Sequence, residues 1–189
     1  MNSGIPGLRY QANYLSEHEQ AELLRQIDAQ TWLTELKRRV QHYGYKYDYR
    51  NRRIDRTMAL GALPDWLARL ADRIRRDGYL PTLAEQVIVN EYLPGQGIGA
   101  HVDCEPCFGD TIISLSLGSG CVMDLRNLSD KRHVPLVLEP GSLLLLAGDA
   151  RYRWTHGIVG RYVDSYDGQV LKRGRRVSVT LRTVILDAG

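Results

Sequence analysis

Two segments near the N-terminus place apolar residues at helical spacing and carry the polar residues that begin a helix. Ser16 and Glu19 match a capping box, in which each side chain accepts a hydrogen bond from the other residue's backbone N–H, and predict a helix over residues 17–30. Pro64 suits the first turn of a second helix, and Gly78 can end it. The apolar positions are Ala21, Leu23, Leu24 and Ile27 in the first helix and Trp66, Leu67, Leu70 and Ile74 in the second.

Beyond residue 80 the apolar residues gather in short β-type runs that glycine and proline turns separate. A pattern of two helices followed by about seven or more short strands is typical of a double-stranded β-helix, or jelly roll, with supporting N-terminal helices. The predicted fold class is therefore α+β, mainly β. The β-type runs span residues 86–92, 111–117, 121–125, 134–138, 142–147, 152–158 and 175–184.

The chain has no internal repeat, low-complexity tract or linker, and its 189 residues fit one compact domain. We expect a single domain over residues 1–189, with the helices in residues 1–84 and the jelly-roll core in residues 85–186. No apolar run approaches the roughly 20 residues that span a bilayer, and the N-terminus lacks a secretion signal. Three cysteines are a poor disulfide framework. We expect a cytoplasmic monomer that does not contact membranes.

Charge is concentrated in residues 37–56, which hold eight basic and two acidic side chains in a chain whose total charge is only +3. The same segment carries Tyr43, Tyr45, Tyr47 and Tyr49 at every second position, so on a strand the four rings would share one face. Basic groups beside aromatic rings suit the phosphates and bases of nucleic acid. The same pattern also fits an edge strand whose tyrosines pack on a helix while its charges face water.

A candidate metal site is formed by His101, Asp103 and His156. In an extended segment His101 and Asp103 point to the same side, and His156 supplies a second imidazole. Two imidazoles and one carboxylate form the facial triad of non-haem iron oxygenases, which leaves coordination positions open for cosubstrate and oxygen. Zinc can use the same ligands in a hydrolase, and a His-x-Asp triplet also arises by chance.

A second set of polar residues suits a dicarboxylate. Arg176 and Arg182 are six residues apart and would lie on one face of a strand, and a buried arginine needs an anion. Upstream, Asn90 and Tyr92 also share one side of a strand and offer hydrogen-bond donors. The alternative is an ordinary edge strand with arginines in water.

Several motifs follow one another over about residues 85–185, and together they resemble the AlkB family of Fe(II)- and 2-oxoglutarate-dependent dioxygenases. The resemblance implies that His101, Asp103 and His156 hold iron. The motifs are Asn90-x-Tyr92, Pro94-Gly95, His101-x-Asp103, Ser114-Leu115-Ser116-Leu117-Gly118, Gly148-Asp149-Ala150-Arg151, His156-Gly157-Ile158 and the pair Arg176 and Arg182.

The same resemblance assigns the cosubstrate contacts. Arg176, helped by Tyr92, would pair with the distal carboxylate of 2-oxoglutarate. Arg182 and Asn90 would act near its 1-carboxylate and keto group. Ser178 stands where some relatives have asparagine. Oxygen would be the third reactant.

A narrower resemblance, to the AlkB-type domain of animal tRNA wobble-uridine hydroxylases, appears in residues 38–45, 61–64, 95–98 and 152–158. The basic segment then occupies the position of the family's nucleotide-recognition lid. The resemblance implies nucleic acid, DNA or RNA, as substrate. The residues it implies for substrate contact are Arg52, Arg53 and Arg56 on phosphates, Tyr45 or Tyr47 lining the pocket, and Glu105 near the base.

The leading hypothesis is oxidative demethylation of alkylated DNA or RNA bases. The alternatives are carbon hydroxylation of a modified tRNA nucleoside, oxidation of a protein side chain, and a non-catalytic nucleic-acid-binding module. The +6 charge of residues 37–56 argues against a protein substrate, and the complete set of metal and cosubstrate residues argues against a non-catalytic module.

Cys104 and Cys107 have a C-x2-C spacing, which can bind zinc or form a dithiol pair. A tetrahedral zinc site would need two further ligands, for which Cys121 and several histidines are available. We expect two ordinary thiols close to the active site, with zinc as the alternative.

Overall fold

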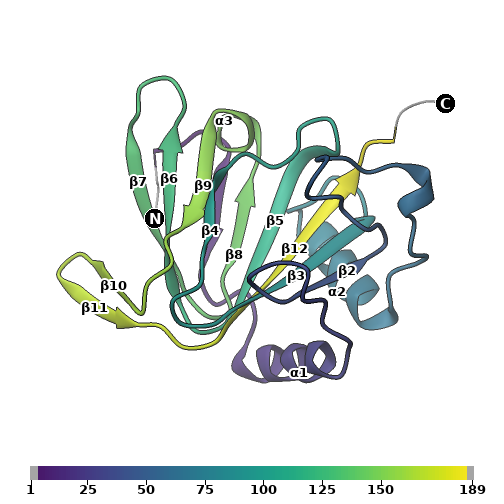
Figure 1. Ribbon diagram of the computed structural model, residues 1–189, viewed down its shortest axis with the longest axis horizontal. Helices are drawn as coiled ribbons and strands as arrows, with labels where there is room; N and C mark the ends of the chain where they lie inside the picture. Colours follow the sequence, from purple (N-terminus) through teal and green to yellow (C-terminus); the bar gives the residue numbers. More distant parts are fainter. Residues whose placement is uncertain (1–3, 187–189) are drawn as a thin grey trace.

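The structure, a computed structural model, describes residues 4–186 (Figure 1). Its strands form a six-stranded sheet in the order β1-β8-β5-β12-β3-β2, a four-stranded sheet in the order β4-β9-β6-β7, and a separate β10-β11 hairpin. The strands are β1 Leu8–Gln11, β2 Val40–Tyr43, β3 Gln86–Tyr92, β4 Ile98–His101, β5 Phe108–Gly118, β6 Cys121–Asn127, β7 His133–Leu138, β8 Leu143–Leu146, β9 Trp154–Ile158, β10 Val163–Tyr166, β11 Gln169–Lys172 and β12 Arg176–Val184.

Most neighbouring strands are not consecutive in the sequence, and all pairings are antiparallel. The arrangement confirms the predicted mainly β jelly roll. Both predicted helices are present as well. They are α1 Glu17–Asp28 and α2 Asp65–Arg76, and the capping box of Ser16 and Glu19 begins the first. Pro64 is the residue that precedes the second helix rather than its first residue. The remaining helical elements are the short α3 Gly148–Tyr152 and the 3-10 turn η1 Arg56–Met58.

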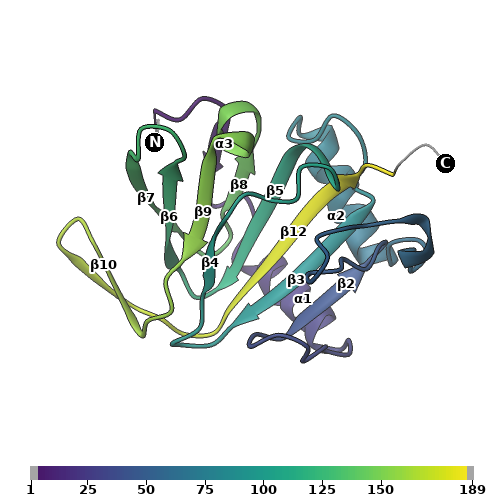
Figure 2. The ribbon, with the colours of Figure 1, turned by 45° about the horizontal axis from the view of Figure 1, so that its top comes forward.

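The two long helices cover one face of the six-stranded sheet (Figures 1 and 2). Leu23 and Ile27 of α1 and Leu67 and Ile74 of α2 are buried in one cluster with apolar residues of the sheet. Side chains alternate between the two faces of a strand, so residues at every second position of β12 face this layer. Those residues are Val177, Val179 and Leu181. The intervening residues of β12 face the four-stranded sheet.

The predicted tyrosine face on one strand is wrong. Strand β2 ends at Tyr43 because Gly44 adopts a φ of +75°, and a Cβ there would lie 1.8 Å from the carbonyl oxygen of Glu85. Beyond that point only isolated bridges, such as Tyr45 with Ala59, continue the pairing. Tyr43 therefore packs beside Trp66 on the helical layer.

The remaining differences from prediction are short elements. Strands β1, β2, β4, β10 and β11 have four residues each, too few for a clear alternation. Tyr152, predicted as strand, ends α3 instead. None of the helices in residues 4–186 has the length and apolar character needed to cross a membrane.

Candidate metal centre and cosubstrate pocket

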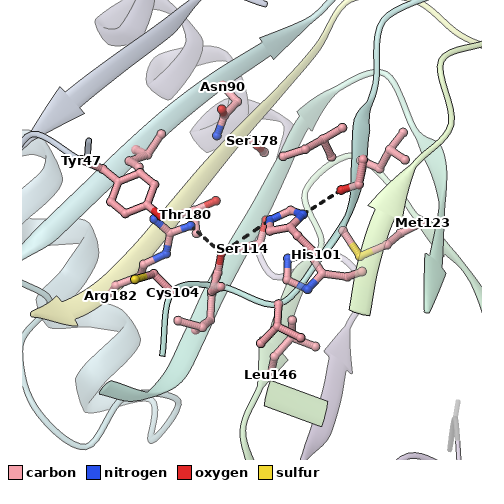
Figure 3. Close-up of a pocket in the computed structure, with 18 of the residues that line it drawn as sticks. Tyr47, Asn90, His101, Cys104, Ser114, Met123, Leu146, Ser178, Thr180 and Arg182 are labelled. Atoms are coloured by element: carbon pink, nitrogen blue, oxygen red, sulfur yellow. Dashed lines mark hydrogen bonds and ion pairs between the residues drawn. The ribbon is translucent and has the colours of Figure 1, made fainter. Parts of the chain in front are cut away.

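A cavity of about 360 Å³ lies between the two sheets (Figure 3). Asn90, Ser178, Thr180 and Arg182 reach it from β3 and β12, whereas His101 and Met123 reach it from the four-stranded sheet. The cavity brings together most of the predicted site residues. They are Tyr47, Arg52, Asn90, Tyr92, His101, Asp103, His156, Arg176, Ser178 and Arg182.

The two histidines meet because β4 and β9 pair with His101 directly opposite His156. Their ring centroids are 4.4 Å apart. Asp103 follows two residues after His101, and one potential ligand atom from each of the three residues lies within 4.8 Å of the others. The structure thus collects the predicted triad from one strand pair and the turn that follows it.

The surroundings of the triad favour a cation. The Nδ1 atom of His101 donates to the carbonyl oxygen of Gly99 at 2.8 Å, so Nε2 is the ring nitrogen available to a metal ion. Desolvation, the largest influence, lowers the pKa of His156 to about 4. Desolvation raises the pKa of Asp103, but the Arg182 guanidinium and the two histidines outweigh it and hold that pKa well below its usual range.

The donor set fits iron(II). The Oδ2 atom of Asp103 is buried and has no hydrogen-bond partner among residues 4–186. Such an atom is costly unless a ligand satisfies it, and a metal ion beside two imidazoles would do so. Two imidazoles and one carboxylate leave the remaining positions of an octahedral ion open.

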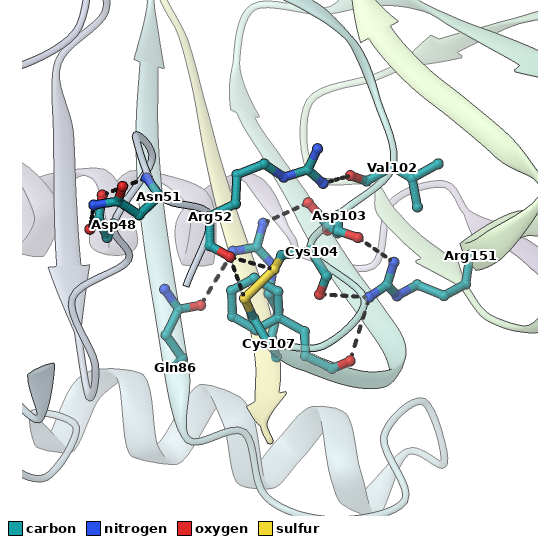
Figure 4. The surroundings of a disulfide bond; sticks show 11 residues. Asp48, Asn51, Arg52, Gln86, Val102, Asp103, Cys104, Cys107 and Arg151 are labelled. Carbon is teal, nitrogen blue, oxygen red and sulfur yellow. Dashed lines mark hydrogen bonds and ion pairs between the residues drawn. A yellow bond between two sulfur atoms is a disulfide. The ribbon is translucent and has the colours of Figure 1, made fainter. Parts of the chain in front are cut away.

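Two buried arginines hold Asp103 in place. The Nη2 atom of Arg182 donates to Asp103 Oδ1 at 3.2 Å. The guanidinium of Arg151, only 2% exposed, donates to the carbonyl oxygens of Asp103 at 2.9 Å and Cys104 at 3.3 Å (Figure 4). Sequence reasoning did not assign a role to Arg151, although the residue lies in one of the motifs that carried the family resemblance.

The prediction of two free thiols is wrong, because Cys104 and Cys107 form a disulfide (Figure 4). The backbone N–H of Cys107 donates to the carbonyl oxygen of Cys104, and the tight turn brings the two Cα atoms to 5.3 Å. Both sulfur atoms also lie 3.1 to 3.3 Å from the carbonyl oxygen of Arg52. The disulfide therefore closes the turn after the triad and packs against the backbone of the basic segment.

The far end of the cavity suits a carboxylate. Arg176 is 3% exposed, its Nη2 donates to Ser116 Oγ at 3.0 Å, and its guanidinium lies 5.4 Å from the ring centroid of Tyr92. The Nε of Arg176 is buried without a partner in the described chain. Ser178 and Asn90 are paired on the neighbouring rung of the sheet. A buried guanidinium with an unused donor is an anion site.

Arg38 is a cavity residue that sequence reasoning did not single out. Its Nε donates to Asn90 Oδ1 at 2.8 Å, and its guanidinium lies 5.8 Å from the ring centroid of Tyr92 and 5.9 Å from that of Tyr49. The excess of basic residues in its segment was the available signal. Only the folded chain shows which of them turns inward.

The basic segment forms one wall of the cavity. Tyr47 and Tyr49 contact each other edge to face at 4.9 Å between centroids, and Tyr47 also packs on Phe108. Arg52 lines the cavity and donates to the carbonyl oxygen of Val102 at 3.4 Å.

Four of the residues predicted to contact substrate do not line this cavity, and Arg56 is one of them, exposed in η1. Tyr45 packs into the apolar cluster behind it. Arg53 is exposed and lies 3.7 to 3.8 Å from the carboxylates of Asp48 and Asp55. Glu105 is exposed in the turn after Asp103. Their part in substrate binding stays a prediction.

A jelly roll with a His-Asp-His cluster beside a buried arginine is typical of mononuclear, 2-oxoglutarate-dependent oxygenases. The family profile described as "2OG-Fe(II) oxygenase superfamily" matches residues 30–182. The chain belongs to this superfamily and, by its relatives, to the AlkB family within it. It is thus an Fe(II)- and 2-oxoglutarate-dependent dioxygenase.

Relatives with AlkB names cover nearly the whole chain. An Arabidopsis thaliana protein named "Alkylated DNA repair protein ALKBH8 homolog" is 37% identical over 95% of this chain and 59% of its own length. A Macaca fascicularis protein named "tRNA (carboxymethyluridine(34)-5-O)-methyltransferase ALKBH8" is 38% identical over 95% of this chain and 30% of its own length. The chain therefore spans less than two thirds of these relatives.

A solved structure supports the fold. The structure titled "The structure of OsALKBH1" superposes with a TM-score of 0.73 at 18% identity, over 94% of this chain and 97% of that one. At 18% identity the match supports the jelly-roll fold alone.

Proposed function

We propose that this dioxygenase removes alkyl groups from the bases of DNA or RNA by oxidation. The observation that carries the proposal is a single cavity, in which an aromatic and cationic wall faces the three candidate metal ligands. The wall is made of Arg38, Tyr47, Tyr49 and Arg52. Tyrosine rings stack on a base and guanidinium groups bind its phosphates. The wall therefore suits a nucleotide that has left a helical stack, as chemistry on a base requires.

His101, Asp103 and His156 would hold the iron, and Arg176 would receive the distal carboxylate of 2-oxoglutarate. Iron(II), 2-oxoglutarate and oxygen together supply the hydroxylation of a C–H bond, with succinate and carbon dioxide as co-products. The chain's own contribution is position. Arg182 and Arg151 fix Asp103, and apolar side chains keep bulk water away from the metal.

The substrate alkyl group determines the product. Hydroxylation of a methyl group on a base nitrogen gives an unstable carbinolamine that releases formaldehyde and the unmodified base. Hydroxylation of a carbon-bound substituent leaves the hydroxyl in place. Formaldehyde release is therefore the sign of demethylation.

Carbon hydroxylation of a modified uridine is the second candidate. The Macaca fascicularis relative is named for a carboxymethyluridine of tRNA. In this chain the Arg38 guanidinium lines the cavity, where a carboxylate carried by a base would pair with it.

The test is turnover of the full chain with iron(II), 2-oxoglutarate and single-stranded oligonucleotides that carry N-methylated bases or carboxymethyluridine. We expect succinate and formaldehyde in equal amounts with the methylated oligonucleotides and neither product from His101→Ala. A mass gain of one oxygen without formaldehyde would select the second candidate. Failure of every modified oligonucleotide to stimulate succinate formation would overturn both.

A matched pair of variants tests the aromatic and cationic wall. Arg52→Ala removes a guanidinium that lines the cavity, whereas Arg50→Ala removes an exposed one in the same loop that does not line it. We expect the KM for the oligonucleotide to rise about ten-fold or more in the first variant and to change little in the second. An equal rise in KM in the two variants would show that Arg52 does not bind the oligonucleotide in this cavity.

A further inference from the structure

A second cavity, of about 450 Å³, opens beside the catalytic one. The two share Arg38, Ile98, Gly99 and Ile158 in their linings, so they are neighbours. The second cavity is a groove between the Gly95–Gly99 segment and the end of β9. Apart from the four residues that both cavities share, its lining residues have no part in the proposed catalytic site.

The floor of the groove is bare backbone. A Cβ at Gly97 would lie 2.1 Å from the carbonyl oxygen of Ile158, and one at Gly160 would lie 2.6 Å from that of Gly95. The two backbones therefore touch, because neither residue carries a side chain. A Cβ at Gly99 would meet nothing within 4 Å, and Gly99 is exposed.

The groove carries a positive charge. Lys37 and Arg126 are exposed and line it together with Arg38. The acidic residue in the lining, Asp124, is already engaged, since its Oδ1 lies 2.6 Å from His133 Nε2 and its Oδ2 lies 3.8 Å from a guanidinium nitrogen of Arg161. The free charges of the groove therefore favour an anion.

An exposed tyrosine stands at the rim. Tyr162 is 70% exposed, and its ring lies 3.2 Å from where a Cβ of Gly95 would be. The segment is held by backbone hydrogen bonds from Gly95 N–H to the Arg161 carbonyl and from Arg173 N–H to the Tyr162 carbonyl. Tyr162 is thus an aromatic ring in solvent on a fixed base.

The β10-β11 hairpin that follows projects away from both sheets (Figures 1 and 2). A buried ion pair anchors its root, where Arg173 donates to both carboxylate oxygens of Asp164 at 2.6 and 2.7 Å. This pair explains the position of Tyr162 but gives no reason for its exposure.

We propose that the groove binds the nucleotides that flank the target base in a single strand, with phosphates on Lys37 and Arg126 and an unpaired base stacked on Tyr162. The inference rests on the proposed function, because it assumes that the target base in the catalytic cavity belongs to a nucleic-acid strand. Exposed aromatic rings beside a cationic groove are how proteins hold single strands, and stacking requires an unpaired base. Both linings include residues of β4, which is an edge strand, so one strand of nucleic acid can pass over this edge and occupy both cavities.

The test measures binding without turnover. Fluorescein-labelled dodecamers of thymidine and of uridine are titrated with the full chain, and fluorescence anisotropy gives the Kd at several salt concentrations. We expect Tyr162→Ala to raise the Kd by five-fold or more, because stacking of a base on an aromatic ring contributes about 1 to 3 kcal/mol. Tyr166→Ala, at the turn of the β10-β11 hairpin, is the matched control and should bind like the wild type.

Charge provides an independent readout. Lys37→Ala and Arg126→Ala should each weaken binding and reduce the slope of log K against log salt by about 0.7, the value for one phosphate contact on a single strand. Lys131→Ala removes an exposed cation far along the β6-β7 turn and should leave the slope unchanged.

The outcomes separate the two proposals. If Tyr162→Ala and the two charge variants all bind as tightly as the wild type, the proposed groove is overturned. Turnover of modified oligonucleotides would still support the proposed function in that case. Absence of both binding and turnover overturns the function and the groove with it. Weaker binding in these variants, with normal binding in Tyr166→Ala, supports the groove.

Discussion

Arg175 and Arg176 are consecutive residues that serve opposite faces of one sheet. Arg175 points to the outer side, where it donates to Glu91 at 2.7 Å and to Asp28 at 2.9 Å. Arg176 points into the cavity and keeps a donor free. The alternation of a strand alone produces this division, so the pair offers a test of the cosubstrate site with an internal control.

We expect Arg176→Met to weaken 2-oxoglutarate binding by about 100-fold, since a buried charge-assisted hydrogen-bond pair contributes about 1.5 to 3 kcal/mol. Arg175→Met should lose stability through its ion pairs but keep the cosubstrate affinity. Calorimetric titration of the manganese-loaded protein with 2-oxoglutarate gives both constants. Equal affinities for the two variants would contradict the assignment of Arg176.

His42 links a single protonation to stability. Desolvation, with the nearby charge of Lys46, lowers the pKa of His42 in the fold to about 4, against about 6.5 in an unfolded chain. The fold therefore binds fewer protons than the unfolded chain between these values. The part of the free energy of unfolding that depends on neutral His42 is fully present above pH 6.5 and is lost as the pH falls toward 4.

Urea unfolding at a series of pH values should detect this contribution. Asparagine at position 42 can keep an acceptor for the backbone N–H of Tyr47, which His42 Nδ1 receives at 3.4 Å, but it cannot be protonated. We expect the stability advantage of the wild type over His42→Asn to shrink by about 2 to 3 kcal/mol between pH 7 and pH 4.5. Parallel curves for the two proteins would show that His42 titrates normally.

At the scale of elements, the Cys104–Cys107 disulfide closes a very short loop. In the chain-entropy account such a loop contributes only about 2 kcal/mol, so its loss should lower the Tm by several degrees without unfolding the chain. The larger consequence should be local, because both sulfurs contact the Arg52 carbonyl. We expect Cys104→Ser with Cys107→Ser to increase proteolytic cleavage within residues 46–56.

Reductant provides the control for this prediction. Dithiothreitol should bring the wild type to the Tm and cleavage rate of the double variant, and it should not change the variant further. Cys121 is buried and unpaired in both proteins. A wild type that dithiothreitol leaves unchanged would show that the pair does not hold the two segments together.

The sequence predicted elements wherever the pattern was local. The capping box at Ser16 located α1, and the period of two placed Arg176, Ser178 and Arg182 on one face of β12. It could not predict that Gly44 would end β2, because the obstacle is the distant Glu85 carbonyl. The same limit applies to the short strands β1, β4, β10 and β11 and to the choice of Arg38 and Arg52, rather than Arg53, as residues of the cavity.

At the scale of the whole molecule, the candidate site joins the two sheets. His101 and His156 belong to the four-stranded sheet, whereas Arg176 and Arg182 belong to the six-stranded one. Asp103 is the link, since it completes the triad and accepts from Arg182. A metal ion would therefore organise the wall against which 2-oxoglutarate binds, and the binding of each should strengthen that of the other.

Thermal unfolding measures this coupling. A ligand at 100 times its Kd adds about 2.7 kcal/mol, which in a chain of this size raises the Tm by about 5 to 10 °C. We expect manganese(II) alone to give a moderate increase, 2-oxoglutarate alone to give almost none, and the two together to exceed the sum of the separate shifts. His156→Ala should remove both the metal-dependent shift and the synergy, because 2-oxoglutarate would lose the ion that it chelates. Purely additive shifts in the wild type would mean that the two ligands bind without contact, in conflict with a shared site between the sheets.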